Sequence, residues 1–307
     1  MCNKNLYYTL QRKSAMVLNL DGNLEDKFGK AEIILGPMAS AKSSLALLVT
    51  AIFRQFANDL NCKVDLFRPD VDTREQMSRM GIEKDKDVTR ISKSEEIIKY
   101  VKEKEKFAKR RVIFIDEVEF LDSEIINAVL ELTKKGHYLL MSGLATNFRG
   151  EPFAFSDYKS TMEDLLRIIP EQNRGTSRWA KCKTCRKTAE YTQRLINDAP
   201  APYYDPLIRV DSEKDKEKSE KKYSYEPRCK EHFYVPGKEE YKFVAFILKQ
   251  NQGLKLNEAI SMAEQNGKIA PDITKQIVAT MCAEKQAYYD GQKIYAPPII
   301  EIATQMP

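Results

Sequence analysis

The chain has 307 residues and a formal net charge of +5, which arises from 50 basic and 45 acidic residues. Its length allows two domains with cores of their own, and its dense charges of both signs do not by themselves indicate nucleic acid. No apolar run is long enough to span a membrane, and six cysteines are too few for a disulfide scaffold. Residues 1–30 are polar and lack the apolar core of a signal peptide, so we expect an N-terminal extension on a cytoplasmic protein.

The first predicted elements enclose a phosphate-binding motif. Residues 31–35 predict a strand and residues 44–57 a helix, and the segment between them is Gly36-Pro37-Met38-Ala39-Ser40-Ala41-Lys42-Ser43. A turn that joins a strand to a helix points backbone N–H groups at an anion. In the pattern G-x-x-x-x-G-K-[ST], the lysine contacts the outer phosphates of a nucleotide and the hydroxyl holds Mg²⁺. Alanine at position 41 restricts the backbone where the pattern has glycine, and a chance strand–turn–helix is the alternative.

Further strands and helices alternate after this loop. Residues 63–67 predict a strand, Glu95 to Lys109 an amphipathic helix, and Arg111 to Ile115 a buried strand that ends in Asp116 and Glu117. At the carboxyl end of a parallel strand, Asp116 would hold Mg²⁺ beside the phosphates, and Glu117 could accept a proton. Two solvated acids are the alternative. A further strand is predicted over His137 to Ser142. The alternation of strands and helices predicts an α/β fold with a mostly parallel sheet over residues 31–170.

A metal site is predicted further along the chain. Cys182 and Cys185 form a C-x₂-C pair, and Cys229 and His232 form a C-x₂-H pair. Three thiolates and one imidazole at these spacings are typical of a closed, tetrahedral structural Zn²⁺ site. Unliganded cysteines are the alternative. This site would belong to a small zinc-ribbon-like domain over residues 171–236.

At this point the residues resemble the type II thymidine kinases, the zinc-containing family with a P-loop. The phosphate loop resembles the motif G-P-M-F-S-G-K-[ST], and residues 115–120 resemble I-D-E-x-Q-F. Residues 143–153 are similar to G-L-D-x-x-F-R-G-E-P-F, and residues 191–196, 201–206 and 225–229 follow in the family's order. The resemblance covers about residues 30 to 236.

The resemblance implies ATP and thymidine as substrates, Mg²⁺, a structural Zn²⁺, and a homo-oligomer, usually a tetramer. Glu117 would be the base that takes the proton of the nucleoside 5′-hydroxyl. Asp72 and Arg74 match a mobile D-x-R segment near the phosphates, and Arg194 would lie near the transferred charge. The residues implied to bind ATP and Mg²⁺ are Gly36, Pro37, Met38, Ala39, Ser40, Ala41, Lys42, Ser43, Asp72, Arg74, Asp116 and Arg194.

The same resemblance implies a thymine slot and a substrate-covering loop from Tyr204 to Tyr225. The implied substrate-binding residues are Met38, Phe120, Leu144, Phe148, Phe153, Thr192, Ile208, Val210 and Tyr225. For the aromatic members, plain core packing is the alternative.

The chain departs from the family at its implied active site. Ala39 stands in place of phenylalanine, Ala41 in place of glycine, Glu119 in place of glutamine, and Ala145 in place of aspartate. The four zinc ligands are retained, as are Lys42, Ser43, Asp116 and Glu117. The chain is therefore expected to be an active thymidine kinase, or alternatively a weakened or inactive kinase fold that acts as a nucleotide-sensing, regulatory or interaction module.

Residues 237–307 lie beyond the resemblance. Helical stripes over residues 239–251 and 254–265, a third helix from Pro271 to about Gln286, and a hairpin at Asp290-Gly291 predict a winged-helix-like domain. It has equal numbers of lysine and acidic residues and no arginine, so it lacks the basic footprint of a DNA reader. A protein-contact or structural role is at least as plausible here as DNA binding, and a zinc-bearing DNA-binding protein is the third reading of the chain.

Overall fold

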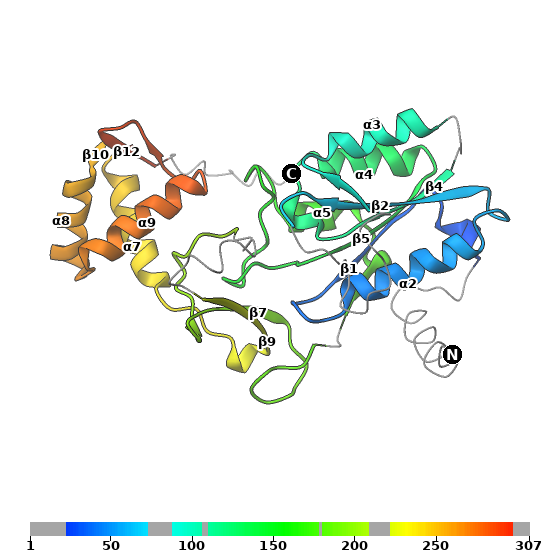
Figure 1. The fold of residues 1–307 in the computed structure, drawn as a ribbon. Coiled ribbons are helices and arrows are strands. Elements are labelled where there is room, and N and C mark those ends of the chain that lie inside the picture. Colours follow the sequence, from blue (N-terminus) through cyan, green and yellow to red (C-terminus); the bar gives the residue numbers. More distant parts are fainter. Residues whose placement is uncertain (1–22, 73–87, 106–109, 178–179, 209–221, 297–307) are drawn as a thin grey trace, which may run out of the picture. The chain divides into compact units, whose positions relative to one another are not determined.

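The computed structural model describes residues 23–72, 88–105, 110–177, 180–208 and 222–296 (Figure 1). The chain divides into two compact units, one formed by residues 1–194 and 210–233 and the other by residues 195–209 and 234–307. Each unit is taken by itself below.

A six-stranded parallel sheet forms the centre of the first unit, in the strand order β3-β2-β4-β5-β1-β6. Its strands are β1 (Ala31–Leu35), β2 (Cys62–Pro69), β3 (Val88–Ile91), β4 (Arg110–Ile115), β5 (Tyr138–Gly143) and β6 (Arg174–Thr176). In the register, Leu35 lies opposite Gly143, and Ile115 lies opposite Met141. β1 and β5 are buried along their whole length, as expected for a parallel sheet covered on both faces. The predicted parallel α/β fold is confirmed.

Helices cover both faces of this sheet. Helix α2 (Lys42–Gln55) lies on one face, and α3 (Glu95–Lys104) and α4 (Ile125–Lys134) lie on the other (Figure 1). On the α2 side, Leu45 and Phe53 pack with Phe114 and Tyr138 of the sheet in one buried cluster. Shorter helical elements are α5 (Met162–Ile168), η1 (Leu24–Lys27), η3 (Val118–Phe120), η4 (Glu171–Asn173) and η5 (Lys230–His232).

Several bounds differ from those expected. Helix α3 ends at Lys104 rather than Lys109, and residues 106–109 lie outside the described residues. Helix α2 begins two residues earlier than predicted, at Lys42. The sequence reading did not anticipate β3, α4 and β6.

A second, three-stranded sheet has the order β8-β7-β9. It is formed by β7 (Tyr191–Ile196), β8 (Ala199–Pro200) and β9 (Tyr223–Arg228). Beside β7, the rings of Tyr191 and Phe233 stack with centroids 4.5 Å apart. The candidate metal ligands lie just before β7 and just after β9.

The second unit is mainly helical. It contains α7 (Lys238–Gln250), β10 (Leu254–Lys255), α8 (Leu256–Gly267), α9 (Pro271–Ala283), β11 (Tyr288–Tyr289) and β12 (Lys293–Tyr295). The three strands form a small antiparallel sheet in the order β10-β12-β11. Helix, strand, two helices and a hairpin are the elements expected of a winged helix, and that assignment stays a prediction.

The start of the expected substrate-covering loop, with the residues just before it, packs within this second unit. Tyr203 contacts Tyr241 of α7 edge-on, with ring centroids 4.9 Å apart. The Leu207 N–H donates to Glu284 Oε1 at 3.0 Å, and the Thr280 hydroxyl donates to the Tyr204 carbonyl at 2.7 Å. Residues 201–207 are therefore fixed to the helices at the C-terminal end of the chain.

Among the described residues, no helix combines the length and apolarity that crossing a membrane requires.

Candidate active site and zinc site

In the phosphate loop between β1 and α2, two alanines have a backbone conformation that is unfavourable for residues with a Cβ. Ala39 has φ 61° and Ala41 has φ 62° and ψ 26°, so both lie in the left-handed region. For an L-residue with a Cβ this conformation costs about 1–2 kcal/mol. At Gly36, an added Cβ would lie 2.7 Å from Ser40 Oγ, so only glycine fits there. The loop keeps a left-handed backbone at the position where its sequence lacks glycine.

Buried polar groups hold this loop. The Lys42 ammonium donates to the Pro37 carbonyl at 3.2 Å, and Lys42 is almost completely buried. Ser177 follows β6: its N–H donates to the Leu35 carbonyl at 2.7 Å, and its hydroxyl donates to the Ser40 carbonyl. The Ser40 hydroxyl is buried with no hydrogen-bond partner among the described residues. Such a buried, unsatisfied group beside a glycine cradle fits a loop that closes around an anion.

Asp116 lies at the carboxyl end of β4, facing the start of α2. The Ser43 hydroxyl donates to Asp116 Oδ1 at 2.7 Å, and the Ser142 hydroxyl of β5 donates to the same oxygen. The Asp116 N–H donates to the Phe67 carbonyl at 3.1 Å, and the residue is fully buried. A carboxylate and a hydroxyl are the oxygen ligands that Mg²⁺ prefers, so this donor set fits that ion.

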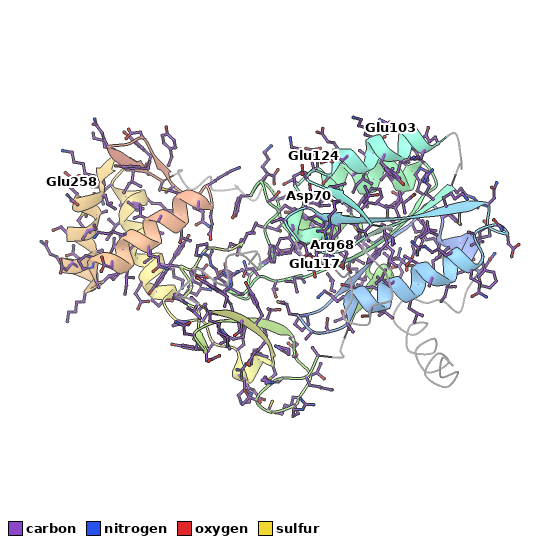
Figure 2. The ribbon with its side chains drawn as sticks, in the orientation of Figure 1. Arg68, Asp70, Glu103, Glu117, Glu124 and Glu258 are labelled. Atoms are coloured by element: carbon purple, nitrogen blue, oxygen red, sulfur yellow. The ribbon has the colours of Figure 1, made fainter. Side chains whose placement is uncertain are left out.

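Glu117 follows at once and has a strained backbone, with φ 51° and ψ 48°. A non-glycine residue in this region costs of order 1–3 kcal/mol and is frequent at active sites. Glu117 is partly exposed, and it lies at the same end of the sheet as Arg68 and Asp70 of the β2 terminus (Figure 2). Its neighbour Glu119 is fully buried. Burial, and next the negative charge of Glu117, raise the pKa of the Glu119 carboxyl well above its ordinary value, while Lys42 opposes the shift.

Aromatic side chains of the expected substrate slot form two groups. The rings of Phe120 and Phe153 pack edge to face with centroids 5.6 Å apart. The Arg194 guanidinium lies 4.0 Å from the centre of the Phe148 ring and 5.5 Å from that of Tyr225. At these distances the rings attract the cation.

The phosphate loop is also tied to β7. The Met38 N–H donates to the Thr192 hydroxyl of β7 at 3.0 Å. This hydrogen bond joins residues 154 positions apart in the chain, and it brings two of the expected substrate-binding residues together.

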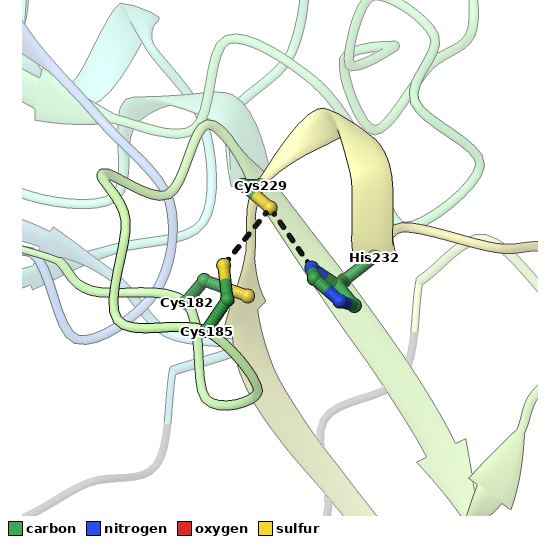
Figure 3. Close-up of side chains that lie close together, drawn as sticks. All are labelled: Cys182, Cys185, Cys229 and His232. Atoms are coloured by element: carbon green, nitrogen blue, oxygen red, sulfur yellow. Dashed lines mark hydrogen bonds between the residues drawn. The ribbon is translucent and has the colours of Figure 1, made fainter.

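The four predicted metal ligands form one cluster (Figure 3). Cys185 Sγ lies 3.6 Å from Cys229 Sγ, which lies 3.2 Å from His232 Nδ1. One candidate ligand atom from each residue lies within 4.8 Å of all the others. In a tetrahedral site with Zn–S bonds of 2.3 Å the sulfurs are about 3.8 Å apart, so the cluster fits a zinc ion.

Local backbone groups prepare one of these cysteines for metal binding. Burial acts to raise the pKa of the Cys182 thiol, but backbone N–H groups of Cys229, Cys185 and Thr184 outweigh it and lower that pKa to about 6. The thiolate, which is the form that binds metal, is therefore favoured at neutral pH.

Comparison with known families decides what this arrangement belongs to. Residues 29–233 match the sequence model of the thymidine kinase family. The chain belongs to the thymidine kinase family. The match includes the phosphate loop, the two acids after β4 and the Cys/His cluster, and the family implies a kinase that uses ATP and thymidine. Among solved structures, the chain is similar to the X-ray structure of the Legionella pneumophila ATPase DotB, with 21% identity, 44% of this chain and 36% of that chain covered, and a TM-score of 0.27. This similarity is too limited to support any conclusion about the chain.

One departure from the thymidine kinase motifs borders a cavity. The cavity has a volume of about 460 Å³ and lies beside the phosphate loop. Its lining residues are Leu35, Gly36, Pro37, Leu144, Ala145, Thr146, Thr176, Ser177, Thr188, Ala189 and Glu190. Ala145 therefore presents a methyl group to a space where the motif G-L-D would place a carboxylate.

The remaining expected site residues lie in different surroundings. Asp72 accepts from Arg68 Nε at 2.8 Å in a buried ion pair at the end of β2, so part of its carboxylate is engaged there. Arg74 and Val210 lie outside the described residues, and Ile208 belongs to the second unit.

Two residues of the candidate site were not predicted from the sequence. Ser177 has no motif around it, because its partner Ser40 is 137 positions away. Arg68 is fully buried, and only the proximity of Asp72, four residues on, hinted at its ion pair.

Proposed function

We propose that the chain is an ATP-dependent thymidine kinase, which transfers the γ-phosphoryl group of ATP to the 5′-hydroxyl of thymidine. The observation that carries the proposal is the hydrogen bond between Ser43 and Asp116, with Glu117 next in the chain. It joins a phosphate loop, a metal-ligand pair and a candidate base at the carboxyl ends of the parallel strands β1 and β4, which lie on either side of β5, and ligands bind at this end of such sheets.

The residues divide the work of phosphoryl transfer in a simple way. Lys42 and the amides of the loop would hold the phosphates, and Glu117 would accept the proton of the attacking hydroxyl. Mg²⁺, held by Ser43 and Asp116, would neutralise charge that develops on the phosphate oxygens. This reaction depends on positioning and charge neutralisation more than on covalent chemistry, and Glu117, partly exposed while Asp116 is buried, is the acid able to meet a substrate.

A neutral nucleoside fits the surroundings of these acids. The aromatic residues Phe120, Phe153 and Phe148 supply apolar surface, and the Met38–Thr192 hydrogen bond ties the phosphate loop to β7. We assign the thymine base to this side of the phosphate loop. That Ile208, Val210 and the backbone between Tyr204 and Tyr225 cover this slot stays an expectation from the family resemblance.

A second candidate is a nucleotide-binding module with weak or absent phosphoryl transfer. The left-handed Ala39 and Ala41 favour it, because strain in the loop acts against tight phosphate binding. The missing carboxylate at Ala145 favours it as well.

One pair of assays separates the two candidates. Full-length, zinc-loaded protein is incubated with ATP, Mg²⁺ and thymidine, and thymidine monophosphate is quantified by chromatography. Glu117→Gln, which keeps size and removes the base, should lower kcat by about 10²–10⁴-fold with ATP affinity unchanged. ATP binding without any monophosphate from the wild type would instead establish the nucleotide-binding module.

The other expectations remain proposals. We propose a homo-oligomer, which light scattering would measure, and a protein-contact role for residues 237–307. Deoxyuridine, offered in the same assay, would report how strictly the slot selects thymine.

A further inference from the structure

A buried acid lies beside the candidate base and has no assigned task. Glu119 is fully inaccessible, and as a carboxylate neither of its oxygens has a hydrogen-bond donor among the described residues. Its side chain is within hydrogen-bonding reach of Glu117. A charged carboxylate in such a place is strongly disfavoured unless it is paired.

The pairing of two acids implies a proton between them. Two ionised carboxylates are both acceptors, so they cannot hydrogen-bond to one another, and their charges repel. If one of them is protonated, it becomes a donor and the contact turns favourable. Glu119 is the member that is fully buried, whereas Glu117 is partly exposed, so the proton belongs on Glu119.

The surroundings hold Glu119 in this position. Gly143, the last residue of β5, lies against the carboxyl group, since an added Cβ there would come within 2.5 Å of Glu119 Oε2 and 3.0 Å of Val118 Cγ1. The charged groups that face Glu119 are Glu117 on its own turn and Lys42 of α2, and β5 contributes the side-chain-free Gly143. The geometry leaves Glu117 as the natural acceptor.

We propose that Glu119 is a positioning residue, held as a neutral carboxylic acid, which donates a hydrogen bond to the Glu117 carboxylate and so orients it toward the nucleoside hydroxyl. This inference rests on the proposed kinase function. The family motif has glutamine at this position, and an amide N–H₂ can donate in the same direction. The chain thus replaces a permanent donor by one that depends on a proton.

The replacement has a consequence for pH. When Glu119 loses its proton, the donor is lost and a second negative charge appears beside the base. Activity of the wild type should therefore fall on the alkaline side, whereas Glu119→Gln, whose donor does not titrate, should keep its activity there.

The test compares the wild type with Glu119→Gln and Glu119→Leu over a series of alkaline pH values, at saturating ATP–Mg²⁺. Glu119→Gln should retain kcat within a few-fold at neutral pH and lose the alkaline limb. Glu119→Leu should lower kcat by about 10²-fold, the usual cost of a misplaced catalytic group, with KM for ATP unchanged. Equal alkaline limbs in the wild type and Glu119→Gln, or full activity of Glu119→Leu, would overturn the proposal.

A spectroscopic measurement separates this inference from the proposed function. The infrared spectrum of the wild type at neutral pH should contain the carbonyl band of a buried protonated carboxyl group, and Glu119→Gln should lack it. Absence of that band from the wild type overturns the inference whatever the turnover. If the band is present but no variant phosphorylates thymidine, the kinase function and the positioning role fall together, and the protonation of Glu119 stands.

Discussion

Replacing Ala41 by glycine should stabilise the folded chain, although glycine loses more conformational freedom on folding than alanine does. Ala41 is the N-cap of α2 and has φ 62° and ψ 26°, a conformation in which its Cβ crowds the backbone. Glycine adopts this conformation without that cost, so the mutation removes strain from the folded state.

The magnitude follows from two opposing terms. Release of the left-handed strain contributes about 1–2 kcal/mol, and the greater freedom of glycine in the unfolded chain opposes it by about 0.5–1 kcal/mol. The net gain is about 1 kcal/mol, or 2–4 °C in Tm for a domain of this size. Ala51 is an exposed residue in the interior of the same helix, and Ala51→Gly should lose about 1 kcal/mol.

Thermal and urea unfolding of the wild type and the two variants would measure both effects. The opposite signs of the two substitutions are the decisive result, because composition is changed identically in each. Destabilisation of Ala41→Gly by as much as Ala51→Gly would refute the strained geometry of the loop. Where the strain also limits phosphate binding, Ala41→Gly should bind ATP more tightly than the wild type.

Three further predictions concern the rest of the first unit. Chelation of zinc, or Cys229→Ser, should lower Tm by about 10 °C or more, since structural zinc contributes folding free energy directly; an unchanged Tm together with no bound metal would contradict the site. Burial, and next the charge of Arg111, lower the pKa of His137, so the neutral form stabilises the fold above the unfolded pKa of about 6.5 and this stability is lost as pH falls; His137→Leu should flatten the pH dependence of unfolding between pH 7.5 and 5. Lys27 pairs with the buried Glu32 at 2.6 Å, so Lys27→Met should cost about 3–5 kcal/mol, whereas Lys242→Met, in an exposed pair, should cost less than about 1 kcal/mol.

The local sequence pattern was sufficient to predict the central strands and the metal site. β1 is a mostly apolar run that ends at a glycine turn, and β4 contains the apolar run Val112 to Ile115, which ends in two acids. β4 was predicted to within one residue. The Cys/His pairs have spacings that few other chemistries require, and the structure brings all four together.

The two missed strands lack such local signals. β3 is a short strand with threonine and arginine at its centre and lies at the edge of the sheet, and β6 has three residues, one of them glycine. Neither contains the apolar repetition from which strands are predicted. Pairing with the central strands defines them, and pairing is a property of the tertiary structure.

The same reasoning explains what was hidden in the candidate site. A sequence motif describes Glu119 only as a departure from glutamine, because its burial depends on Gly143, a residue of another strand. The hold of Ser177 on Ser40 and the packing of residues 201–207 on the C-terminal helices likewise join segments distant in the chain. Protonation states and hydrogen bonds between distant segments depend on contacts in the folded chain, so no local sequence motif predicts them.

The central claim is that a phosphate loop with alanine at positions 39 and 41 still holds a triphosphate. Isothermal titration of ATP–Mg²⁺ into the zinc-loaded, full-length protein tests it most directly, with Lys42→Ala as the matched variant. We predict saturable binding by the wild type that Lys42→Ala weakens strongly. A well-folded wild type that takes up no ATP at millimolar concentration would contradict both the kinase and the nucleotide-binding module.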